Sequence, residues 1–375
     1  MRHARLLICV LVLVLETSCL FGKRNAPPAT PTMPAASSSP SRSGSPSELI
    51  DAAARSIFFL NASHGWAGGR GTIFATGDGG RSWRSARVGL GVVSSIEFVD
   101  RFRGWAVAAT TLLRSSDGGA TWKAIGRPPE PLESIHFSTR ERGWGVTSAE
   151  HVFRSVDGGL SWHPVAFPSR VQSICFSGDQ RGWAAGHRRI YATKDRGVSW
   201  HVSFRASTPR NLEADFDATV HCSGAGVWAL FADGGASNQQ SYFVVRSLNS
   251  GRTWAAVSQG AYVSILGPRK PELQDIGAYS GPFSVPKASV GVFMGRCYPC
   301  DPQPSWSVTV TNDGGKTWLA HKIPHTVTYW ELSSVSFIDA RLGWVVGGVS
   351  SGPGEIRSTR DGGRTWHVQL TSPLL

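Results

Sequence analysis

The eight residues SSDGGATW (115–122) decide the fold of this chain, because their pattern returns along most of its length. Every copy follows S/T-x-D/N-x-G-x-S/T-W. The seven copies are TGDGGRSW (76–83), SSDGGATW (115–122), SVDGGLSW (155–162), TKDRGVSW (193–200), SLNSGRTW (247–254), TNDGGKTW (311–318) and TRDGGRTW (359–366). The acid position recurs after 39, 40 and 38 residues in the first four copies, and after 54, 64 and 48 in the rest. Repeats of this length are typical of solenoids and propellers.

Each copy belongs to a longer unit, seen best over residues 94–125. Short apolar-rich runs alternate there with Gly, Asp and Arg turns, which predicts four antiparallel strands. The expected strands are Ile96 to Val99, Trp105 to Ala109, Thr111 to Arg114 and Thr121 to Ile125. Seven such units predict an all-β chain that forms a seven-bladed β-propeller of four-stranded antiparallel blades, with the repeated motif on the turn before each last strand.

The repeated motif resembles the Asp-box, or BNR repeat, and the longer unit is similar to that of the Ycf48/Hcf136-like family of photosystem II assembly factors. The resemblance covers about residues 52–375. It implies a protein-binding propeller with a basic surface that faces membrane-protein partners. Sialidases, xyloglucanases and sorting receptors carry the same repeat, so the resemblance leaves carbohydrate binding or glycoside hydrolysis as the alternative function.

We interpret the motif residues as structural rather than catalytic. A carboxylate in a turn accepts backbone N–H groups, glycine supplies positive φ, and a Trp packs as an anchor between sheets. Asn249 replaces the acid in one copy, which a structural acceptor tolerates and a general base does not. The residues given this role are Asp78, Asp117, Asp157, Asp195, Asn249, Asp313 and Asp361 with Trp83, Trp122, Trp162, Trp200, Trp254, Trp318 and Trp366.

The N-terminal residues predict export. Arg2 and Arg5 precede an apolar run from Leu6 to Leu15 that is too short to span a bilayer, so residues 1–19 read as a signal peptide. Cys19 is a candidate for lipidation, although Glu16 departs from the lipoprotein pattern. Residues 20–51, rich in Pro, Ser and Ala, predict a disordered linker, and residues 52–375 the propeller. We expect a periplasmic, extracellular or lipid-anchored monomer that binds no nucleic acid.

Arginines on one face of the predicted ring are candidate binding residues. Equivalent turns carry Arg101, Arg103, Arg140, Arg142, Arg181 and Arg341. An arc of guanidiniums suits carboxylate or phosphate recognition, and the formal charge of +12 favours anionic partners. The alternative is that each arginine pairs with an acid of its own turn, such as Asp100 or Asp179. Inserted loops of the last three units gather on the opposite face and are the second candidate surface.

No catalytic residue is predicted. A sialidase would need an Arg-Ile-Pro stretch and a Tyr nucleophile with a Glu partner, and the sequence contains no Arg-Ile-Pro. The acids to test for glycoside hydrolysis are Asp215, Asp217, Asp233 and Asp275, in the inserted loops. Whether the protein is an enzyme therefore stays open at this stage, with non-enzymatic binding favoured.

The cysteines predict disulfides rather than metal binding. Cys297 and Cys300 form a lone C-x-x-C, for which a local disulfide is the expected role in an exported chain. Cys175 and Cys222 fall on the first strands of neighbouring units and either pair or serve as small buried residues. We expect no metal and no cofactor.

Overall fold

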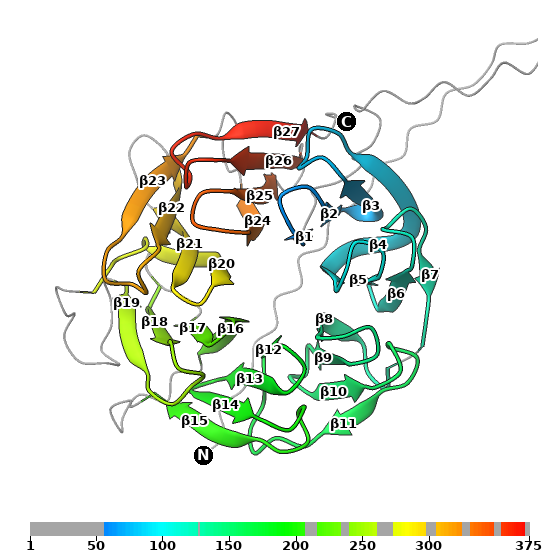
Figure 1. Cartoon of the computed structure of the whole chain (residues 1–375), viewed down its shortest axis with the longest axis horizontal. Coiled ribbons are helices and arrows are strands. Elements are labelled where there is room, and N and C mark those ends of the chain that lie inside the picture. Colours follow the sequence, from blue (N-terminus) through cyan, green and yellow to red (C-terminus); the bar gives the residue numbers. More distant parts are fainter. Residues whose placement is uncertain are drawn as a thin grey trace, which may run out of the picture. The chain divides into compact units, whose positions relative to one another are not determined.

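The chain is a β-propeller in its described part. The computed structural model describes residues 56–126, 128–206, 216–233, 240–260, 273–297, 305–324, 331–348 and 354–371. These lie in one compact unit, Gly44–Leu375, and contain strands and turns without a helix. The sheets stand around a central axis, each with its first strand innermost (Figure 1). The predicted signal peptide and linker, with Cys19, lie outside the described residues.

Strands are hydrogen-bonded in sequence order within every sheet. The first sheet has seven strands: β1 (Ser56–Phe59), β2 (Gly65–Gly68), β3 (Arg70–Thr76), β4 (Arg84–Phe98), β5 (Gly104–Ala108), β6 (Thr111–Ser115) and β7 (Lys123–Ala124). Two four-stranded sheets follow: β8 (Leu132–Phe137), β9 (Gly143–Thr147), β10 (Val152–Ser155) and β11 (His163–Val165), then β12 (Ser173–Ser177), β13 (Arg181–Gly186), β14 (Arg189–Thr193) and β15 (His201–Arg205).

Three further four-stranded sheets complete the ring. They are β16 (Asp217–Ser223), β17 (Gly226–Ala232), β18 (Tyr242–Ser247) and β19 (Ala255–Gln259); β20 (Tyr279–Lys287), β21 (Val290–Cys297), β22 (Ser305–Thr311) and β23 (Leu319–Ile323); and β24 (Glu331–Phe337), β25 (Gly343–Gly348), β26 (Gly354–Thr359) and β27 (His367–Thr371). All pairs are antiparallel, so the prediction of four-stranded antiparallel blades is confirmed for these five sheets.

The seven-stranded sheet departs from the expected pattern because β4 is continuous over 15 residues. Its first half pairs with β3, from Ala75↔Arg84 to Arg70↔Val92. Its second half pairs with β5, from Val93↔Ala108 to Phe98↔Gly104. The repeat predicts four short strands in each unit, whereas the chain here stays extended between its two partners. Five blades are therefore separate four-stranded sheets. The total number of blades depends on whether the seven-stranded sheet is counted as one blade or as two.

A repeated aromatic sandwich joins neighbouring repeats. The ring of Phe98 stacks on Trp66, with centroids 3.5 Å apart, and meets the edge of Trp122 at 5.7 Å. A Cβ on Gly104 would lie 2.4 Å from the same ring, so only glycine leaves room for it. The same stacking recurs for Phe59 on Trp344, Phe137 on Trp105 and Phe176 on Trp144. The Phe and Gly-Trp positions of the repeat are thus one interlocking packing unit.

Side chains from the preceding sheet satisfy the exposed N–H groups of several innermost strands. Phe137 N–H donates to Glu97 Oε2 at 2.9 Å, and Phe176 N–H donates to His136 Nε2 at 3.1 Å. His136 Nδ1 lies 3.0 Å from Glu97. Burial disfavours the charged form of His136, but the adjacent Glu97 carboxylate outweighs this and raises the pKa of the imidazole. These contacts give hydrogen-bond acceptors to backbone N–H groups at the inner edges of the sheets, which would otherwise stay unpaired.

The first and last sheets close the ring. The N–H of Phe59 donates to Ser336 Oγ at 2.9 Å, and that of Ile57 donates to Ser334 Oγ at 3.3 Å. Trp344 Nε1 donates to the Gly79 carbonyl at 3.2 Å. Contacts between residues more than 260 positions apart therefore fix the circular arrangement seen in Figure 1.

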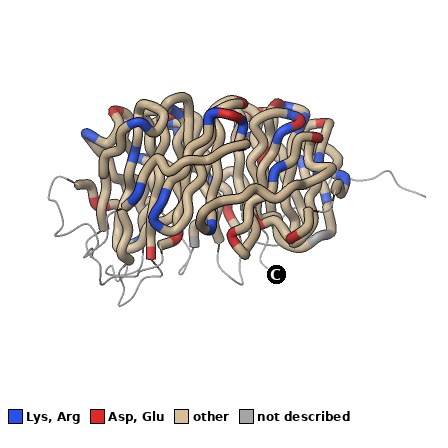
Figure 2. The backbone as a smooth tube through the Cα atoms, turned by 90° about the horizontal axis from the view of Figure 1, so that it is seen from below, with Lys and Arg blue, Asp and Glu red and all other residues tan. Residues whose placement is uncertain are grey.

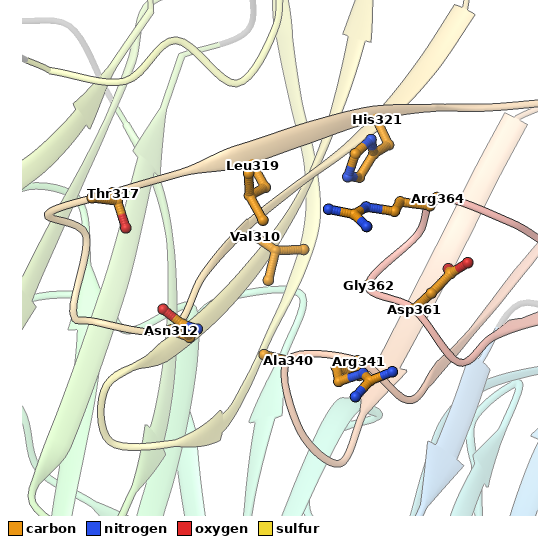
Figure 3. Close-up of a pocket in the computed structure, with 10 residues that line it drawn as sticks. All are labelled: Val310, Asn312, Thr317, Leu319, His321, Ala340, Arg341, Asp361, Gly362 and Arg364. Atoms are coloured by element: carbon orange, nitrogen blue, oxygen red, sulfur yellow. The ribbon is translucent and has the colours of Figure 1, made fainter.

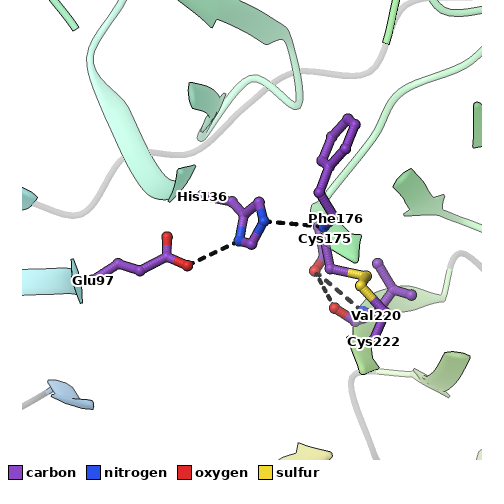
Figure 4. The surroundings of a disulfide bond; sticks show 7 residues. Glu97, His136, Cys175, Phe176, Val220 and Cys222 are labelled. Carbon is purple, nitrogen blue, oxygen red and sulfur yellow. Dashed lines mark hydrogen bonds and ion pairs between the residues drawn. A yellow bond between two sulfur atoms is a disulfide. The ribbon is translucent and has the colours of Figure 1, made fainter. Parts of the chain in front are cut away.

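Cys175 of β12 and Cys222 of β16 form a disulfide between two innermost strands, with Cα atoms 6.0 Å apart (Figure 4). The sequence left open whether these cysteines pair or serve as small buried residues, and the structure shows that they pair. The pair lies next to Phe176, whose N–H is held by His136. The disulfide predicted between Cys297 and Cys300 stays a prediction, because Cys300 lies outside the described residues.

Candidate functional site

The seven repeated turns share one hydrogen-bond arrangement. In the second copy Ser115 Oγ donates to Asp117 Oδ1 at 2.8 Å, while Thr121 donates through its N–H to Oδ1 at 2.9 Å and through its hydroxyl to Oδ2 at 2.6 Å. Ser115 Oγ also accepts the N–H of Gly119 at 2.8 Å. The same contacts recur at Asp78, Asp157, Asp195, Asp313 and Asp361. Each carboxylate is thus engaged within its own turn.

Asn249 makes the same three side-chain hydrogen bonds as the acids of the other copies, but in one of them donor and acceptor are exchanged. Its Oδ1 accepts Ser247 Oγ and Thr253 N–H, both at 2.9 Å, and its Nδ2 donates to Thr253 Oγ1 at 2.8 Å. The threonine hydroxyl becomes the acceptor, so an amide serves where the other copies have an acid. At the next position Ser250 adopts a φ of 59°, in the region where most copies have glycine.

The turn hydrogen bonds favour the ionised acids. At Asp78 burial alone would raise the pKa, but bonds from the Ser82 hydroxyl and N–H and from Thr76 outweigh it and lower the pKa to about 2. Asp157 is lowered to about 2 for the same reasons, with Ser161 as the main donor. A carboxylate whose pKa lies this low is a weak base at neutral pH, which does not suit a proton acceptor.

The tryptophans of the repeat occupy two environments. The Gly-Trp residues are fully buried: Trp66, Trp105, Trp144, Trp183 and Trp344 are each at most 1% exposed, as is Trp228, which follows Val227. Among the motif tryptophans only Trp162 is buried, and the other six are partly exposed. Trp66 and Trp105 also donate from Nε1 to glycine carbonyls in the next turn, at 2.9 Å. The buried link between sheets therefore comes mainly from the Gly-Trp position.

Two of the six candidate arginines are engaged by acids of a neighbouring sheet. Arg140 Nε donates to Asp100 Oδ2 at 2.8 Å, from the β8–β9 turn to the β4–β5 turn. Arg142 forms an ion pair with Asp179 of the β12–β13 turn. The alternative of pairing within one turn is thus wrong for these two arginines, because the acids that they contact belong to adjacent repeats.

The other four candidate arginines differ in their surroundings. The guanidinium of Arg101 lies 4.5 Å from the ring centroid of exposed Phe102. Arg181 Nη1 lies 3.5 Å from Ser250 Oγ. Arg103 is partly exposed, and Arg341 is exposed and lines a groove. The six arginines do not form one uniform row, since each meets a different environment.

A groove of about 260 Å³ lies between the β22–β23 hairpin and the turns of the last sheet. Its lining includes Val310, Leu319, His321, Arg341 and Arg364. In Figure 3 the Arg364 guanidinium points toward His321 and Val310, and Arg341 approaches from the neighbouring turn. The side chain of Leu319 is 58% exposed. We call this combination of an apolar wall and two arginines the β23 groove.

The turns that carry the two arginines are fixed by their backbones. Asp339 Oδ1 accepts the N–H groups of Arg341 and Leu342 at 2.7 and 2.8 Å, and Gly362 N–H donates to the Arg341 carbonyl at 3.0 Å. Asp361, the acid in the lining, is engaged by Thr359 and Thr365. The guanidiniums of Arg341 and Arg364 form no ion pair with another described residue. They can therefore accept an external anion.

The sequence reasoning found Arg341 but missed the other groove residues. One signal was present: Leu319 follows the motif Trp, where the other copies have a polar or small residue. Those residues are Arg84, Lys123, His163, His201, Ala255 and His367.

Three of the acids considered for hydrolysis accept hydrogen bonds from neighbouring groups. Asp217 accepts Gln172 Nε2 at 3.0 Å, and Asp233 accepts Ser241 N–H at 3.0 Å. Asp275 accepts the hydroxyl of Tyr242 at 2.9 Å, and burial together with the Asp275 charge raises the pKa of Tyr242 well above its ordinary value. A buried phenol of this kind is a poor nucleophile. Asp215 lies outside the described residues.

Charge is mixed around the ring rather than gathered on one rim. Viewed edge-on, basic and acidic segments are interspersed (Figure 2). Among the described residues, no three His, Cys, Asp or Glu side chains gather as a metal site would require. No helix suited to crossing a bilayer occurs in the described ranges.

The sheets and their turns define a β-propeller with four-stranded antiparallel blades. No family model matches the chain, and no curated protein sequence does. Solved structures match its fold. YCF48 bound to a D1 peptide is 15% identical with a TM-score of 0.53, covering 80% of this chain and 93% of its own. The WD40 propeller domain of Doa1 is 12% identical with a TM-score of 0.53, covering 84% of this chain and 95% of its own.

A glycoside hydrolase is also among the similar structures. The GH74 enzyme of Niastella koreensis is 13% identical with a TM-score of 0.60, and the match covers 86% of this chain. It covers 54% of the enzyme, so this chain spans about half of that protein's length. At such identities these likenesses establish the propeller fold alone.

Proposed function

We propose that the chain is an exported, non-enzymatic β-propeller that binds a protein partner at the cell envelope, in the manner of a Ycf48-like assembly or interaction factor. The observation that carries the proposal is the β23 groove. Its apolar wall of Val310 and Leu319 lies beside the guanidiniums of Arg341 and Arg364, which form no ion pair with any acid in the described ranges. This combination suits a peptide segment with an acidic side chain next to an apolar one. Similarity to YCF48, solved with a bound peptide, supports a protein ligand.

The proposal includes seven blades, with the seven-stranded sheet counted as two blades joined through β4. The change of partner from β3 to β5 within β4 supports this division. So does the distribution of the turns, because this sheet carries two of the seven copies, at Asp78 and Asp117.

We propose further that the repeated turns are Asp-box turns whose acids are structural. Their engagement within each turn and the amide at Asn249 support that role. The carbonyls of Gly118 and Gly158 accept the indole N–H groups of tryptophans in the preceding repeat, so these turns also join neighbouring repeats.

The proposed localisation is periplasmic, extracellular or lipid-anchored, and it rests on the sequence of residues 1–19. The proposed protein is monomeric, contacts the membrane through the lipid anchor alone, and binds neither a cofactor nor nucleic acid. Arg101, Arg103 and Arg181 are proposed as further contacts for an anionic partner, since no acid of the described residues pairs with them.

The second candidate function is carbohydrate binding or hydrolysis, favoured by the likeness to the GH74 enzyme. Against hydrolysis stands the local engagement of Asp217, Asp233 and Asp275. An assay on xyloglucan and on sialosides with the purified chain separates the two functions. Turnover that is lost on changing one of these acids to Asn, in a variant that stays folded, would replace the scaffold proposal.

The scaffold proposal is tested by capture from an envelope extract with three forms of the full chain: wild type, R341E/R364E and the control R84E/R87E. The control makes the same change of charge on strand β4, away from the groove. We expect a defined set of proteins to be captured by wild type and by the control, and lost with R341E/R364E. Equal capture by all three forms would show that the groove does not bind the partner.

A further inference from the structure

Two arginines lie opposite each other on neighbouring strands β14 and β15, in a sheet that does not contribute to the β23 groove. Arg189 of β14 lies directly opposite Arg205 of β15 in the antiparallel register. Like charges at such positions destabilise a sheet. The corresponding terminal pairs of the other four-stranded sheets avoid this arrangement. They are Val152↔Val165, Phe243↔Gln259, Trp306↔Ile323 and Glu355↔Thr371.

The two guanidiniums open into a pocket of about 420 Å³ formed by Ser169, the turn at 186–189 and residues 205–206. No Asp or Glu of the described residues lines this pocket, which we call the Arg189 pocket. Neither Arg189 nor Arg205 forms a side-chain ion pair or hydrogen bond within the described residues. The sheet therefore places partly exposed Arg189 beside exposed Arg205, and no acid in the described ranges pairs with either guanidinium.

The walls of the Arg189 pocket are fixed by contacts that leave the two guanidiniums free. Ser169 Oγ is hydrogen-bonded to the hydroxyl of buried Tyr191 at 2.6 Å. Gly186 lies so close to the backbone that a Cβ there would be 2.0 Å from the Arg170 carbonyl oxygen. The Ala206 N–H donates to the Arg188 carbonyl at 2.9 Å. A pocket with such walls needs little rearrangement to receive a ligand.

Glu150, an acid of the preceding sheet, is engaged by two other side chains. Its Oε2 lies 3.2 Å from Nε2 of His187, and its Oε1 accepts Gln172 Nε2 at 2.8 Å. The contact to His187, which lines the Arg189 pocket, therefore does not involve Arg189 or Arg205.

We propose that the Arg189 pocket binds a tetrahedral oxyanion, namely a phosphate or sulfate group, between the guanidiniums of Arg189 and Arg205. Guanidinium groups bind such oxyanions through paired N–H donors, and the Ser169 hydroxyl at the pocket wall adds a polar contact. An anion also neutralises the repulsion across β14 and β15. The site lies among the β13–β14 turn and the end of β15, so it does not depend on the function proposed for the β23 groove.

The test uses the full chain and four sodium salts at equal ionic strength: phosphate, sulfate, acetate and chloride. Thermal unfolding and titration calorimetry are measured for wild type, R189Q, R205Q and the control R87Q. Arg87 is also an exposed residue of an outer strand, but it lies opposite Thr72. Acetate distinguishes a tetrahedral oxyanion from any carboxylate, and chloride reports general screening.

We expect saturable binding of phosphate or sulfate to wild type and R87Q, and binding about tenfold weaker or more in R189Q and R205Q. In chloride alone, R205Q should unfold at the same or a higher temperature than wild type, because one of two opposed charges is gone. The proposal is overturned if acetate binds as well as phosphate and sulfate, if R189Q and R205Q bind like wild type, or if wild type shows no saturable binding.

Discussion

Replacing Asp117 tests whether the repeated acid holds a turn or performs chemistry. Asp117→Ala removes three hydrogen bonds, from Ser115 Oγ, Thr121 N–H and Thr121 Oγ1. A typical hydrogen bond contributes about 0.5–1.5 kcal/mol net. Because the side chain is exposed and water replaces part of each bond, we expect a loss of about 2 kcal/mol in the free energy of unfolding.

Asp117→Asn should cost much less. Asn249 shows that an amide keeps the same three contacts when the threonine hydroxyl reverses from donor to acceptor. We expect a loss below about 1 kcal/mol, within the range of a surface substitution that keeps its hydrogen bonds. Asn249→Ala is the matched case and should cost about as much as Asp117→Ala, because it removes the same number of contacts.

The measurement is urea unfolding followed by tryptophan fluorescence, with the midpoint and slope compared among the three variants. Equal destabilisation by Asp117→Asn and Asp117→Ala would refute the hydrogen-bond argument. A fully stable Asp117→Asn variant that has lost partner capture, or any hydrolytic activity, would instead assign chemistry to this acid.

Four further outcomes follow from the packing and the turns. Gly104→Ala should lower stability by about 1–3 kcal/mol or more in urea unfolding, because its Cβ would push the Phe98 ring away from Trp66. Ser250→Gly should raise the melting temperature slightly, since glycine relieves a φ of 59° at a net gain of about 0.5–1 kcal/mol, and an unchanged or lower value would contradict this. Reducing the Cys175–Cys222 disulfide, or changing both residues to Ser, should lower the free energy of unfolding by about 4 kcal/mol, because the bond closes a loop of 47 residues in the unfolded chain. Thermal unfolding with and without reductant measures this loss. The free energy of unfolding should fall as the pH drops from about 4 to about 2. The folded state lowers the pKa of Asp78 and Asp157 from 3.8 to about 2, so both acids stabilise the fold above pH 3.8, and this stability is lost as they become protonated in the folded state. Urea unfolding across this pH range measures the effect, and a flat profile would count against the turn hydrogen bonds.

The repeat predicted the fold well because its turn and strand residues act within one unit. The Asp117 turn uses residues 115–121 alone, so the sequence contains all its partners. The strands expected at Trp105 to Ala109 and Thr111 to Arg114 agree with β5 and β6 to within a residue. The continuous strand β4 does not follow from a unit of four short strands, and Gly89 and Gly91 adopt positive φ within an extended segment that has partners on two sides.

Contacts between units could not be read from one repeat. The Arg140–Asp100 pair and the Cys175–Cys222 disulfide join residues 40 and 47 positions apart, and the curvature of the ring brings them together. The same geometry explains the tryptophans. Inner strands converge toward the axis and bury Trp105 completely, whereas outer strands diverge and leave Trp122 partly exposed.

Departures from the repeat mark the two binding surfaces proposed for this chain. Leu319 replaces the polar or small residue that follows the motif Trp in every other copy, and it forms the exposed apolar wall of the β23 groove. Arg189 and Arg205 place like charges where the other four-stranded sheets pair apolar or uncharged partners, or a single acid with Thr371. The turns and the aromatic sandwiches hold each repeat together without these residues. The opposed arginines lower the stability of their sheet, because like charges repel. Because such positions cost stability or leave apolar area in water without a ligand, each is better explained by an external partner than by the fold.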